Sequence, residues 1–332
     1  MSGDGAELAR LDIATVGESM VVLVPSRGES LERTAETALF PAGAESNVAS
    51  YLSQLGHAVG WGSRVGNDPF GRRLLRSFSE IGIDVSQVVI DDYRPTGVYF
   101  KDPGGEPSVY YYRSGSAASA LGVGDVAPLV ARSARLHITG ITAALGKGAA
   151  LTLFNIVREA RAAGKRISFD VNYRAPLWPT AEAAPVLAEL GGLADTVFVG
   201  LDEAQHVWGI ERADEIPAIF ARSAEVVVKD GGDGATTFIG DDVFREPAPT
   251  VEVLEPVGAG DAFAAGYLSA SIRGASPAER LRWGHLLAAR VLVAPSDSVV
   301  LPPAGVLAAQ AEADPAAWAA LSFAGSEGSC TV

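Results

Sequence analysis

The stretch Gly258-Ala259-Gly260-Asp261 places an acidic side chain beside small residues at the start of an expected helix over about 259–273. Two glycines separated by one small residue leave consecutive backbone amides unobstructed. Those N–H groups, with the positive end of the helix dipole, can hold an anion whose charge is growing. Asp261 would then stand in the first helical turn, placed to take a proton from a hydroxyl. The alternative is an ordinary glycine-rich turn whose aspartate favours the helix N-terminus electrostatically.

Short apolar runs alternate with helical patterns over most of the chain, and these elements must position the acid. The runs that indicate buried strands are 13–16, 20–24, 136–139, 167–170, 196–199 and 226–228. Such alternation predicts an α/β protein with a mostly parallel sheet and helices on both faces. Ligands of such sheets bind outside the carboxyl ends of the strands. A site is therefore expected at the loops that follow these strands and at the helix start near 259.

Helix signals and turn residues mark the other elements. One helical pattern begins at Glu45 and ends at Gly56, and a second is opened by Asp68 and Pro69 and stops near Gly82. Further helices are expected over about 148–163 and 277–293, and an antiparallel hairpin over 236–239 and 243–245.

Residues 84–114 differ in their residue pattern from the rest of the chain. The runs 98–100 and 109–112 are rich in β-forming residues, and a loop rich in glycine and proline separates them. Together with the segment around 18–40, they predict a small sheet outside the main core.

Composition limits the class of protein. The 332 residues include 48% apolar and 20% charged side chains, which is enough to bury a core. A net charge of −14 argues against nucleic acid or an anionic membrane as the main partner. The single cysteine, Cys330, excludes an intrachain disulfide. The first residues lack the pattern of a signal peptide, and no apolar run reaches transmembrane length, so we expect a cytoplasmic protein.

Two motifs resemble those of the PfkB (ribokinase-like) carbohydrate kinases. The C-terminal motif of that family is present as GAGDAF at 258–263. The N-terminal motif is present as AGAESNVA at 42–49, followed by LG at 55–56 and GNDPFG at 66–71. Two motifs in the correct order are far more specific than either alone, and the resemblance covers roughly residues 11–300.

The resemblance implies a ribokinase-like three-layer α/β fold, with a mostly parallel central sheet flanked by helices and a small β-sheet lid. The kinase domain would span 11–310, with lid strands from about 18–40 and 95–113. Residues 311–332 would form a C-terminal tail.

Four further segments resemble the 2-keto-3-deoxygluconate kinase branch of this family: GE at 17–18, YYYRSGSA at 110–117, GITAAL at 140–145 and DVNYR at 170–174. The substrate of that branch carries a carboxylate, which a guanidinium can bind with two parallel hydrogen bonds. Arg113 and Arg174 would serve this role. The alternatives are a solvated charge at a strand end for Arg113 and a structural ion pair after Asp170 for Arg174.

The resemblance also implies a role for each matching residue. Sugar contacts are implied at Gly43, Asn47, Tyr99, Tyr111, Arg113, Ile141, Arg174 and, late in the chain, Asp297. The base is implied at Asp261, and the anion hole at Gly258, Ala259 and Gly260. Nucleotide contacts are implied at Lys229, Gly231, Gly234 and His285, and the water shell of Mg²⁺ at Glu203.

Several positions depart from the family pattern. Glu255 and Pro256 replace an Asp and a Thr before the C-terminal motif, and Gly200 replaces the Asn of an Asn-x-x-Glu element. His285 stands where an Asn commonly lines the adenine pocket, and Ala42 replaces the first glycine of a pair. These changes fall at positions implied to serve the water shell of the metal ion and the nucleotide pocket. The base and the anion hole are unchanged.

The sequence favours an ATP-dependent, Mg²⁺-requiring kinase of a sugar acid, in which Asp261 deprotonates a hydroxyl and the 258–261 amides hold the phosphoryl charge. One alternative is a kinase for a neutral sugar such as fructose, or for a nucleoside. The other is a degenerate kinase that binds sugar without turnover. The expected partners are the sugar, ATP and a second copy of the chain in a homodimer or larger homo-oligomer. The exact sugar, the hydroxyl and a monovalent cation requirement stay open.

Overall fold

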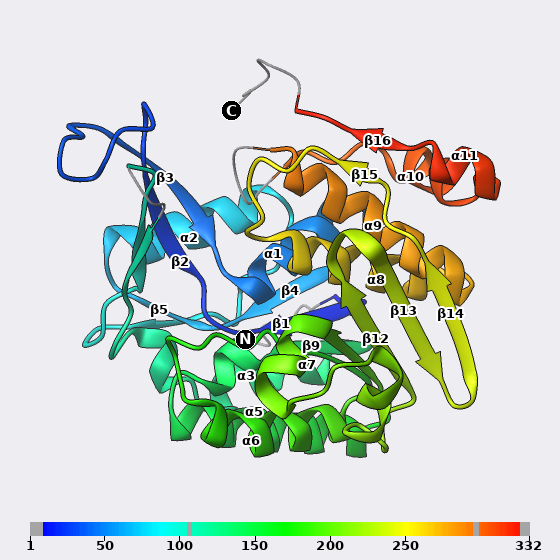
Figure 1. Ribbon diagram of the computed structural model, residues 1–332. Coiled ribbons are helices and arrows are strands. Elements are labelled where there is room, and N and C mark those ends of the chain that lie inside the picture. Colours follow the sequence, from blue (N-terminus) through cyan, green and yellow to red (C-terminus); the bar gives the residue numbers. More distant parts are fainter. Residues whose placement is uncertain (1–8, 105–107, 295–298, 326–332) are drawn as a thin grey trace.

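The computed structural model describes residues 9–104, 108–294 and 299–325 (Figure 1). Within these residues the main sheet has eight strands in the order β14-β13-β12-β11-β10-β9-β1-β4. Its parallel part consists of β1 (Ile13–Val16), β4 (Val59–Gly62), β9 (Arg135–Thr139), β10 (Arg166–Asp170), β11 (Thr196–Gly200) and β12 (Glu225–Asp230). An antiparallel hairpin of β13 (Gly234–Ile239) and β14 (Asp242–Glu246) completes one edge. The expected mostly parallel sheet and its hairpin are confirmed.

Helices cover both faces of this sheet. One face packs against α1 (Ala44–Gln54), α2 (Pro69–Glu80), α8 (Ala259–Ile272) and α9 (Pro277–Leu292). The other packs against α3 (Val123–Ala131), α5 (Lys147–Ala162), α6 (Thr180–Leu193) and α7 (Leu201–Trp208). The short α4 (Gly140–Ala143) follows β9 directly. Figure 1 shows the two helix layers on opposite sides of the sheet. The three-layer α/β class is therefore confirmed.

Local signals set the helix ends as expected. The Asp68 carboxylate accepts a hydrogen bond from Gly71 N at 2.8 Å, and Pro69 fills the first helical position of α2. Helix α1 ends just before Gly56, whose φ of +85° is a left-handed conformation that favours glycine.

A second sheet stands beside the main body. It has the order β3-β2-β7-β8, formed by β2 (Met20–Pro25), β3 (Thr37–Ala42), β7 (Val98–Asp102) and β8 (Ser108–Tyr112). Strand β2 pairs antiparallel with β3 and parallel with β7, and β7 pairs antiparallel with β8. The predicted small sheet is confirmed. Two two-stranded sheets, β5 (Arg64–Gly66) with β6 (Val89–Asp91) and β15 (Thr250–Val251) with β16 (Ser322–Phe323), are additional.

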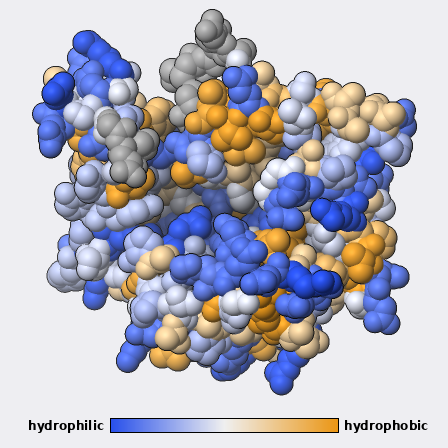
Figure 2. All heavy atoms as spheres, in the orientation of Figure 1, coloured by the Kyte–Doolittle hydropathy of each residue, from blue (hydrophilic) through white to orange (hydrophobic). Residues whose placement is uncertain are grey.

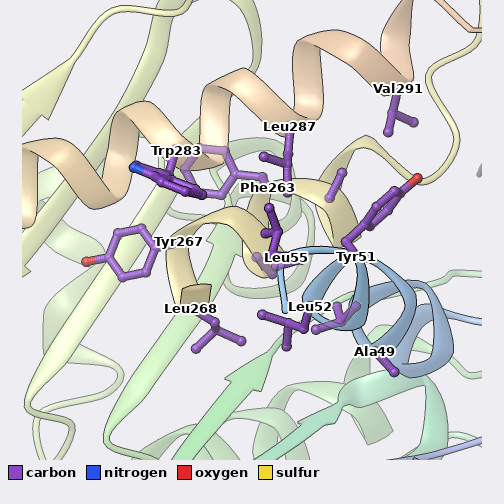
Figure 3. Packing of buried hydrophobic residues seen from close by; sticks show 14 of the residues in the cluster. Ala49, Tyr51, Leu52, Leu55, Phe263, Tyr267, Leu268, Trp283, Leu287 and Val291 are labelled. Carbon is purple, nitrogen blue, oxygen red and sulfur yellow. The ribbon is translucent and has the colours of Figure 1, made fainter. Parts of the chain in front are cut away.

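The core around α8 is packed tightly enough to fix the helix that carries the candidate base. Figure 3 shows Leu52 of α1 and Leu55, just after it, directed toward Phe263 and Leu268 of α8, with α9 above them. Helices α8 and α9 approach so closely that a Cβ on Gly266 would lie 2.4 Å from Trp283 O. Because α8 is buried on nearly all sides, its N-terminus is held rigidly at the edge of the sheet.

The C-terminal region extends the ordered body beyond the expected boundary at residue 310. Helices α10 (Ala304–Ala311) and α11 (Pro315–Ala319) are followed by β16, which pairs with β15. The Trp318 side chain is buried, and the Asp314 carboxylate caps α11. Up to residue 325, therefore, the segment expected as a tail packs on the molecule. Alanine-rich helices have little amphipathic contrast, so the pattern alone does not reveal this packing.

Candidate active site

The carboxyl ends of the parallel strands meet the N-terminus of α8 at a large cavity. Its volume is about 1250 Å³, and it lies between the main sheet, β8, α9 and the loop before α8. Figure 2 shows this face of the molecule hollowed near its centre, with hydrophilic residues along the lower rim. The predicted residues that line the cavity are Tyr111, Arg174, Glu203, Lys229, Gly231, Gly234, Gly258, Ala259, Gly260, Asp261 and His285.

Asp261 lies in the first turn of α8, and its carboxylate is held from two sides. Asn47 Nδ2 donates to Oδ2 at 2.9 Å, and Asn172 Nδ2 donates to Oδ1 at 3.2 Å. Asn172 follows β10 with a φ of +40°, a left-handed conformation that is uncommon for residues other than glycine. Burial raises the pKa of Asp261 to about 7, against the hydrogen bond from Asn47, which favours the charged form. A carboxylate with this pKa is suited to act as a general base near neutral pH.

The residues before Asp261 present backbone amides to the cavity. Gly258 caps α8 with a φ of +83°, and the first N–H groups of a helix have no partner within the helix. Ala259 N donates a long hydrogen bond of 3.4 Å to Pro256 O. A Cβ on Gly260 would lie 3.5 Å from Lys229 Nζ, which places the ammonium group beside the start of α8. This arrangement can hold an anion between backbone N–H groups and a lysine.

A charged network connects the ends of β10, β11 and β12. Lys229 Nζ lies 3.0 and 3.2 Å from the two carboxylate oxygens of Asp170. Burial lowers the pKa of Lys229, but the carboxylates of Asp170 and Glu203 outweigh it and raise the pKa above its usual value. The lysine therefore stays positively charged at the wall of the cavity.

Glu203 is fixed by backbone amides at the start of α7. Its Oε2 accepts from Gly200 N at 2.8 Å, and its Oε1 accepts from Tyr173 N at 3.0 Å. Burial raises the pKa of Glu203, and the positive charge of Lys229 opposes this shift. Gly200, where the family has Asn, serves here as the N-cap residue whose amide holds Glu203.

The donor set fits a magnesium ion that is held mainly by phosphates and water. Glu203 presents a carboxylate at the cavity wall, and the buried Asn172 Oδ1 has no hydrogen-bond partner among the described residues. No group of three His, Cys, Asp or Glu side chains within those residues is arranged as a metal cage. Mg²⁺ keeps several waters and commonly uses one or two carboxylates plus substrate phosphates, so these oxygen donors suit it.

The residues predicted for sugar contact fall into two groups. Tyr111 and Arg174 line the cavity, whereas Gly43, Asn47, Tyr99, Arg113 and Ile141 are absent from its described lining. Two residues of the second group contact residues that line the cavity. Asn47 donates to Asp261, and the Tyr99 ring packs 5.3 Å from the Tyr111 ring. Ile141 lies in α4, and Asp297 falls outside the described residues. The role of each residue stays a prediction.

Arg113 is held in place by Glu18, which the Gly-Glu segment at 17–18 contains without revealing this contact. Its side chain is only 10% exposed and forms an ion pair with Glu18, whose side chain is 1% exposed. Ser116 Oγ also donates to Glu18 Oε1. Arg113 is therefore not the solvated charge considered from the sequence. Its Nε is buried without a hydrogen-bond partner among the described residues.

Arg174 is the more exposed of the two arginines, with 53% of its side chain accessible. Its Nη1 donates to Tyr173 O at 3.0 Å and lies 3.8 Å from Glu203 Oε1. The guanidinium thus stands at the cavity with a weak internal partner and with room for a ligand.

Glu45 is a second carboxylate that the sequence motifs contain without revealing its role. Its Oε1 accepts hydrogen bonds from Thr139 N, Thr139 Oγ1 and Thr142 Oγ1 at 3.2, 2.8 and 2.7 Å. Burial raises the pKa of Glu45, against the hydrogen bonds from the two threonines. A Cβ on Gly17 would lie 2.1 Å from Glu45 Cδ, so the Gly-Glu pair at 17–18 leaves space for this carboxyl group. Glu45 ties α1, which carries Asn47, to the end of β9.

The opposite part of the cavity is formed by glycines and by α9. Gly231 and Gly234 adopt φ values of +50° and +129° in the turn after β12. His285 Nε2 lies 3.2 Å from Glu246 O, and burial lowers the pKa of His285 to about 4, which keeps the ring neutral. These residues bring backbone amides and an apolar wall to the same cavity as Asp261.

Comparisons with known proteins agree with this architecture. The pfkB family carbohydrate kinase pattern matches residues 10–302. The chain is 36% identical over 301 residues to a 2-dehydro-3-deoxygluconokinase of Bacillus subtilis (strain 168), covering 88% of this chain and 93% of that protein. Among solved structures, a PfkB protein from Polaromonas sp. JS666 shares 35% identity with a TM-score of 0.80, covering 90% of this chain and 99% of the other.

A ribokinase II from E. coli solved in complex with ATP and Mg²⁺ has a TM-score of 0.82 at 22% identity, covering 90% of this chain and 98% of the other. That likeness shows the fold. The family match spans nearly all of the main sheet and the residues that surround the cavity. The chain therefore belongs to the pfkB family and is a carbohydrate kinase.

Proposed function

We propose that this kinase transfers the γ-phosphoryl group of ATP to a hydroxyl of a 2-keto-3-deoxy sugar acid, with 2-keto-3-deoxygluconate as the favoured substrate. The name of the Bacillus subtilis relative supports the substrate class. The E. coli ribokinase II, which was solved with ATP and Mg²⁺ bound, supports that nucleotide and that metal ion. The observation that carries the proposal is the pair of guanidinium groups at this end of the cavity. Arg174 lines the cavity, and Arg113, whose side chain is 10% exposed, lies 6.0 Å from the ring of Tyr111, which also lines it.

In this mechanism Asp261 takes the proton from the sugar hydroxyl as that oxygen attacks the γ-phosphorus. A bond forms between the hydroxyl oxygen and phosphorus, and the bond to the bridging oxygen of the leaving diphosphate breaks. Asn47 and Asn172 orient the carboxylate so that an oxygen faces the hydroxyl. After release of the sugar phosphate, Asp261 loses the proton to solvent, which is favourable for a group with a pKa of about 7.

Charge on the transferring group would be stabilised by groups that are already in position. The amides at the start of α8 and the Lys229 ammonium converge on one part of the cavity. Because Asp170 holds the ammonium from behind, the lysine needs no rearrangement when the phosphate charge develops. When bound, Mg²⁺ would neutralise charge on the nucleotide phosphates, with Glu203 and Asn172 holding its water shell.

One observation favours the neutral-sugar alternative. Glu18 already balances the charge of Arg113, so the arginine has a structural role even without a carboxylate ligand. The two functions differ in what the site must recognise, because a neutral sugar brings no charge to Arg113 or Arg174.

A coupled ATPase assay with 2-keto-3-deoxygluconate, 2-keto-3-deoxygalactonate, fructose, ribose and a nucleoside separates the possibilities. We expect the highest kcat/KM for a keto-deoxy acid. A higher value for a neutral sugar or a nucleoside would overturn the sugar-acid proposal. Sugar binding without turnover for any compound would indicate a degenerate kinase. Replacing K⁺ by tetramethylammonium in the same assay tests for a monovalent cation.

A further inference from the structure

The family match ends at residue 302, and the structure continues beyond it. We call residues 304–325 the C-terminal segment; it contains α10, α11 and β16. Figure 1 shows it lying along α9 next to β15. Leu307, Ala311 and Trp318 are buried in the same core cluster as α8 and α9. Arg282 of α9 also donates to Ala311 O and Ala313 O, at 3.0 and 2.6 Å.

This segment holds the chain that leads out of β14. Trp318 Nε1 donates to Pro247 O at 3.0 Å. Thr250 N donates to Leu321 O at 3.2 Å, and Glu252 N donates to Phe323 O at 2.9 Å, in the parallel pairing of β15 with β16. Backbone groups of residues 247, 250 and 252 are therefore bonded to the C-terminal segment.

The stretch that is held in this way is a wall of the cavity. Ala248, Pro249, Thr250 and Val251 line it together with side chains of α9, among them His285, Ala288 and Leu292. This wall is largely apolar, unlike the part formed by Asn172, Arg174 and Glu203. The flat faces of a purine base fit this apolar wall. A triphosphate fits the glycine amides at 231–234 and 258–260.

The C-terminal segment also supports α9 from the side away from α8. Trp318 lies with its ring 6.4 Å from the His285 ring, and the Arg282 guanidinium stacks 5.0 Å above the Trp318 ring. Arg282 Nε donates to Glu246 Oε2, and Glu246 O contacts His285 Nε2. One aromatic side chain thus fixes both walls of the apolar end, the 247–252 stretch and the His285 turn of α9.

We propose that the C-terminal segment sets the shape of the base-binding end of the cavity and thereby the affinity for the adenine nucleotide, acting through Pro247–Glu252 and His285. This rests on the proposed function, in that it takes the cavity to be the ATP site. Trp318 is a positioning residue here, because it touches the walls and not the nucleotide. None of the described residues of the segment lines the cavity, so we expect the sugar end and Asp261 to change less than the base-binding end.

The test compares Trp318→Ala with Trp208→Ala in the full chain. Trp208 is a control of the same residue type, because its partly buried ring packs edge-on at 5.6 Å against Phe220 on the other face of the sheet. Calorimetry with ATP and Mg²⁺ should show binding weakened about tenfold or more in Trp318→Ala, which corresponds to about 1.4 kcal/mol. The KM for ATP should rise by the same factor, while kcat and the KM for the sugar stay within about twofold of the unaltered chain and of Trp208→Ala.

A further variant keeps the test decisive if Trp318→Ala does not fold. Trp318→Phe retains an aromatic ring and loses the indole N–H, so nucleotide affinity should fall by a smaller factor in the same direction. Unchanged ATP affinity in these variants, or an equal rise in the KM for the sugar, overturns the inference. Lack of ATP binding by the unaltered chain overturns the proposed function, and the inference with it.

Discussion

The carboxylate of Asp261 lies where two amide side chains and a helix N-terminus converge, in surroundings that strongly disfavour its charge. Replacing it by asparagine keeps the size of the side chain and removes the base. We expect Asp261→Asn to lower kcat by roughly 10²–10⁴-fold, the usual scale for general base catalysis. Calorimetry should show that sugar binding survives. Near-normal turnover in this variant would remove Asp261 from the mechanism.

The same residue should set the pH dependence. Because the pKa of Asp261 is raised to about 7, the carboxylate is protonated and inactive below that pH, and kcat/KM should rise as pH increases through about 7. Asn47 donates a hydrogen bond that lowers this pKa. Asn47→Leu should therefore move the rise of kcat/KM to higher pH, whereas a loss of packing alone would lower activity at every pH. A profile that keeps its midpoint in Asn47→Leu contradicts the assignment.

The two arginines test the substrate class. Removing a desolvated arginine that binds a carboxylate costs about 2–5 kcal/mol, or roughly 30- to several-thousand-fold in affinity. We expect Arg113→Ala and Arg174→Ala to weaken use of 2-keto-3-deoxygluconate, with the larger loss at Arg113, which is 10% exposed against 53% for Arg174. A neutral sugar of similar size should lose much less, because it leaves no charge unpaired.

Glu18 provides the control for Arg113. Arg113→Ala alone leaves the buried Glu18 carboxylate without its ion-pair partner, which could disturb the fold. The double variant Glu18→Gln/Arg113→Ala removes both charges. Its kcat/KM should still fall more for the acid substrate than for the neutral sugar. Equal losses for acid and neutral sugars in that variant would assign Arg113 to the fold and favour the neutral-sugar kinase.

At the scale of elements, the sequence predicts those strands and turns that depend on residues close together along the chain. Apolar runs identify five of the six parallel strands of the main sheet and miss β4, whose four residues include two glycines. The GAGD motif predicts the turn that starts α8, because a left-handed Gly258 is a local requirement. Helices α3 and α6 are less evident, since each contains an internal proline, Pro128 or Pro185. Strand β3 contains Pro41, which is tolerated because β3 lies at the edge of its sheet.

The buried acids of the site were beyond prediction for a different reason. Glu45 receives its hydrogen bonds from Thr139 and Thr142, and Glu18 pairs with Arg113, all of them distant along the chain. A periodic pattern of apolar residues shows which faces are buried. It does not distinguish a buried, paired glutamate from an exposed one, because the residue type is the same. The contacts of Trp318 are hidden similarly, because its partners lie in α9 and in the chain between β14 and β15.

The packing of α8 on α9 can be tested at Gly266. A Cβ there would lie 2.4 Å from Trp283 O, so Gly266→Ala must push the two helices apart. We expect a loss of about 1–3 kcal/mol in the free energy of unfolding, measured by urea denaturation. Gly192 in α6 has open space around it, and Gly192→Ala should be neutral or slightly stabilising. Equal free energies for the two variants would mean that α8 is not held by this contact.

At the scale of the whole molecule, we expect the two faces of the small sheet to have different roles. Because side chains alternate along a strand, Tyr99, Tyr111 and Arg113 share one face, and Tyr110 and Tyr112 point to the other. The first face stands beside the cavity, so the sheet can serve as the predicted lid that excludes water from phosphoryl transfer. None of the helices in the described parts of the chain is long and apolar enough to cross a membrane. A second copy of the chain is the partner we expect for the other face.

That face should be covered in a homodimer. Tyr110 and Tyr112 are 50% and 66% exposed at β8, which is also the edge strand of the sheet. Aromatic side chains gathered on an exposed edge favour association. Sedimentation velocity at micromolar concentration should show a species of twice the chain mass, and Tyr112→Lys should convert it to monomer. Tyr93, which is 94% exposed and is not part of these strands, supplies the control Tyr93→Lys. A monomer for the unaltered chain would contradict the dimer but not the predicted lid, because the lid would close over the sugar with its opposite face.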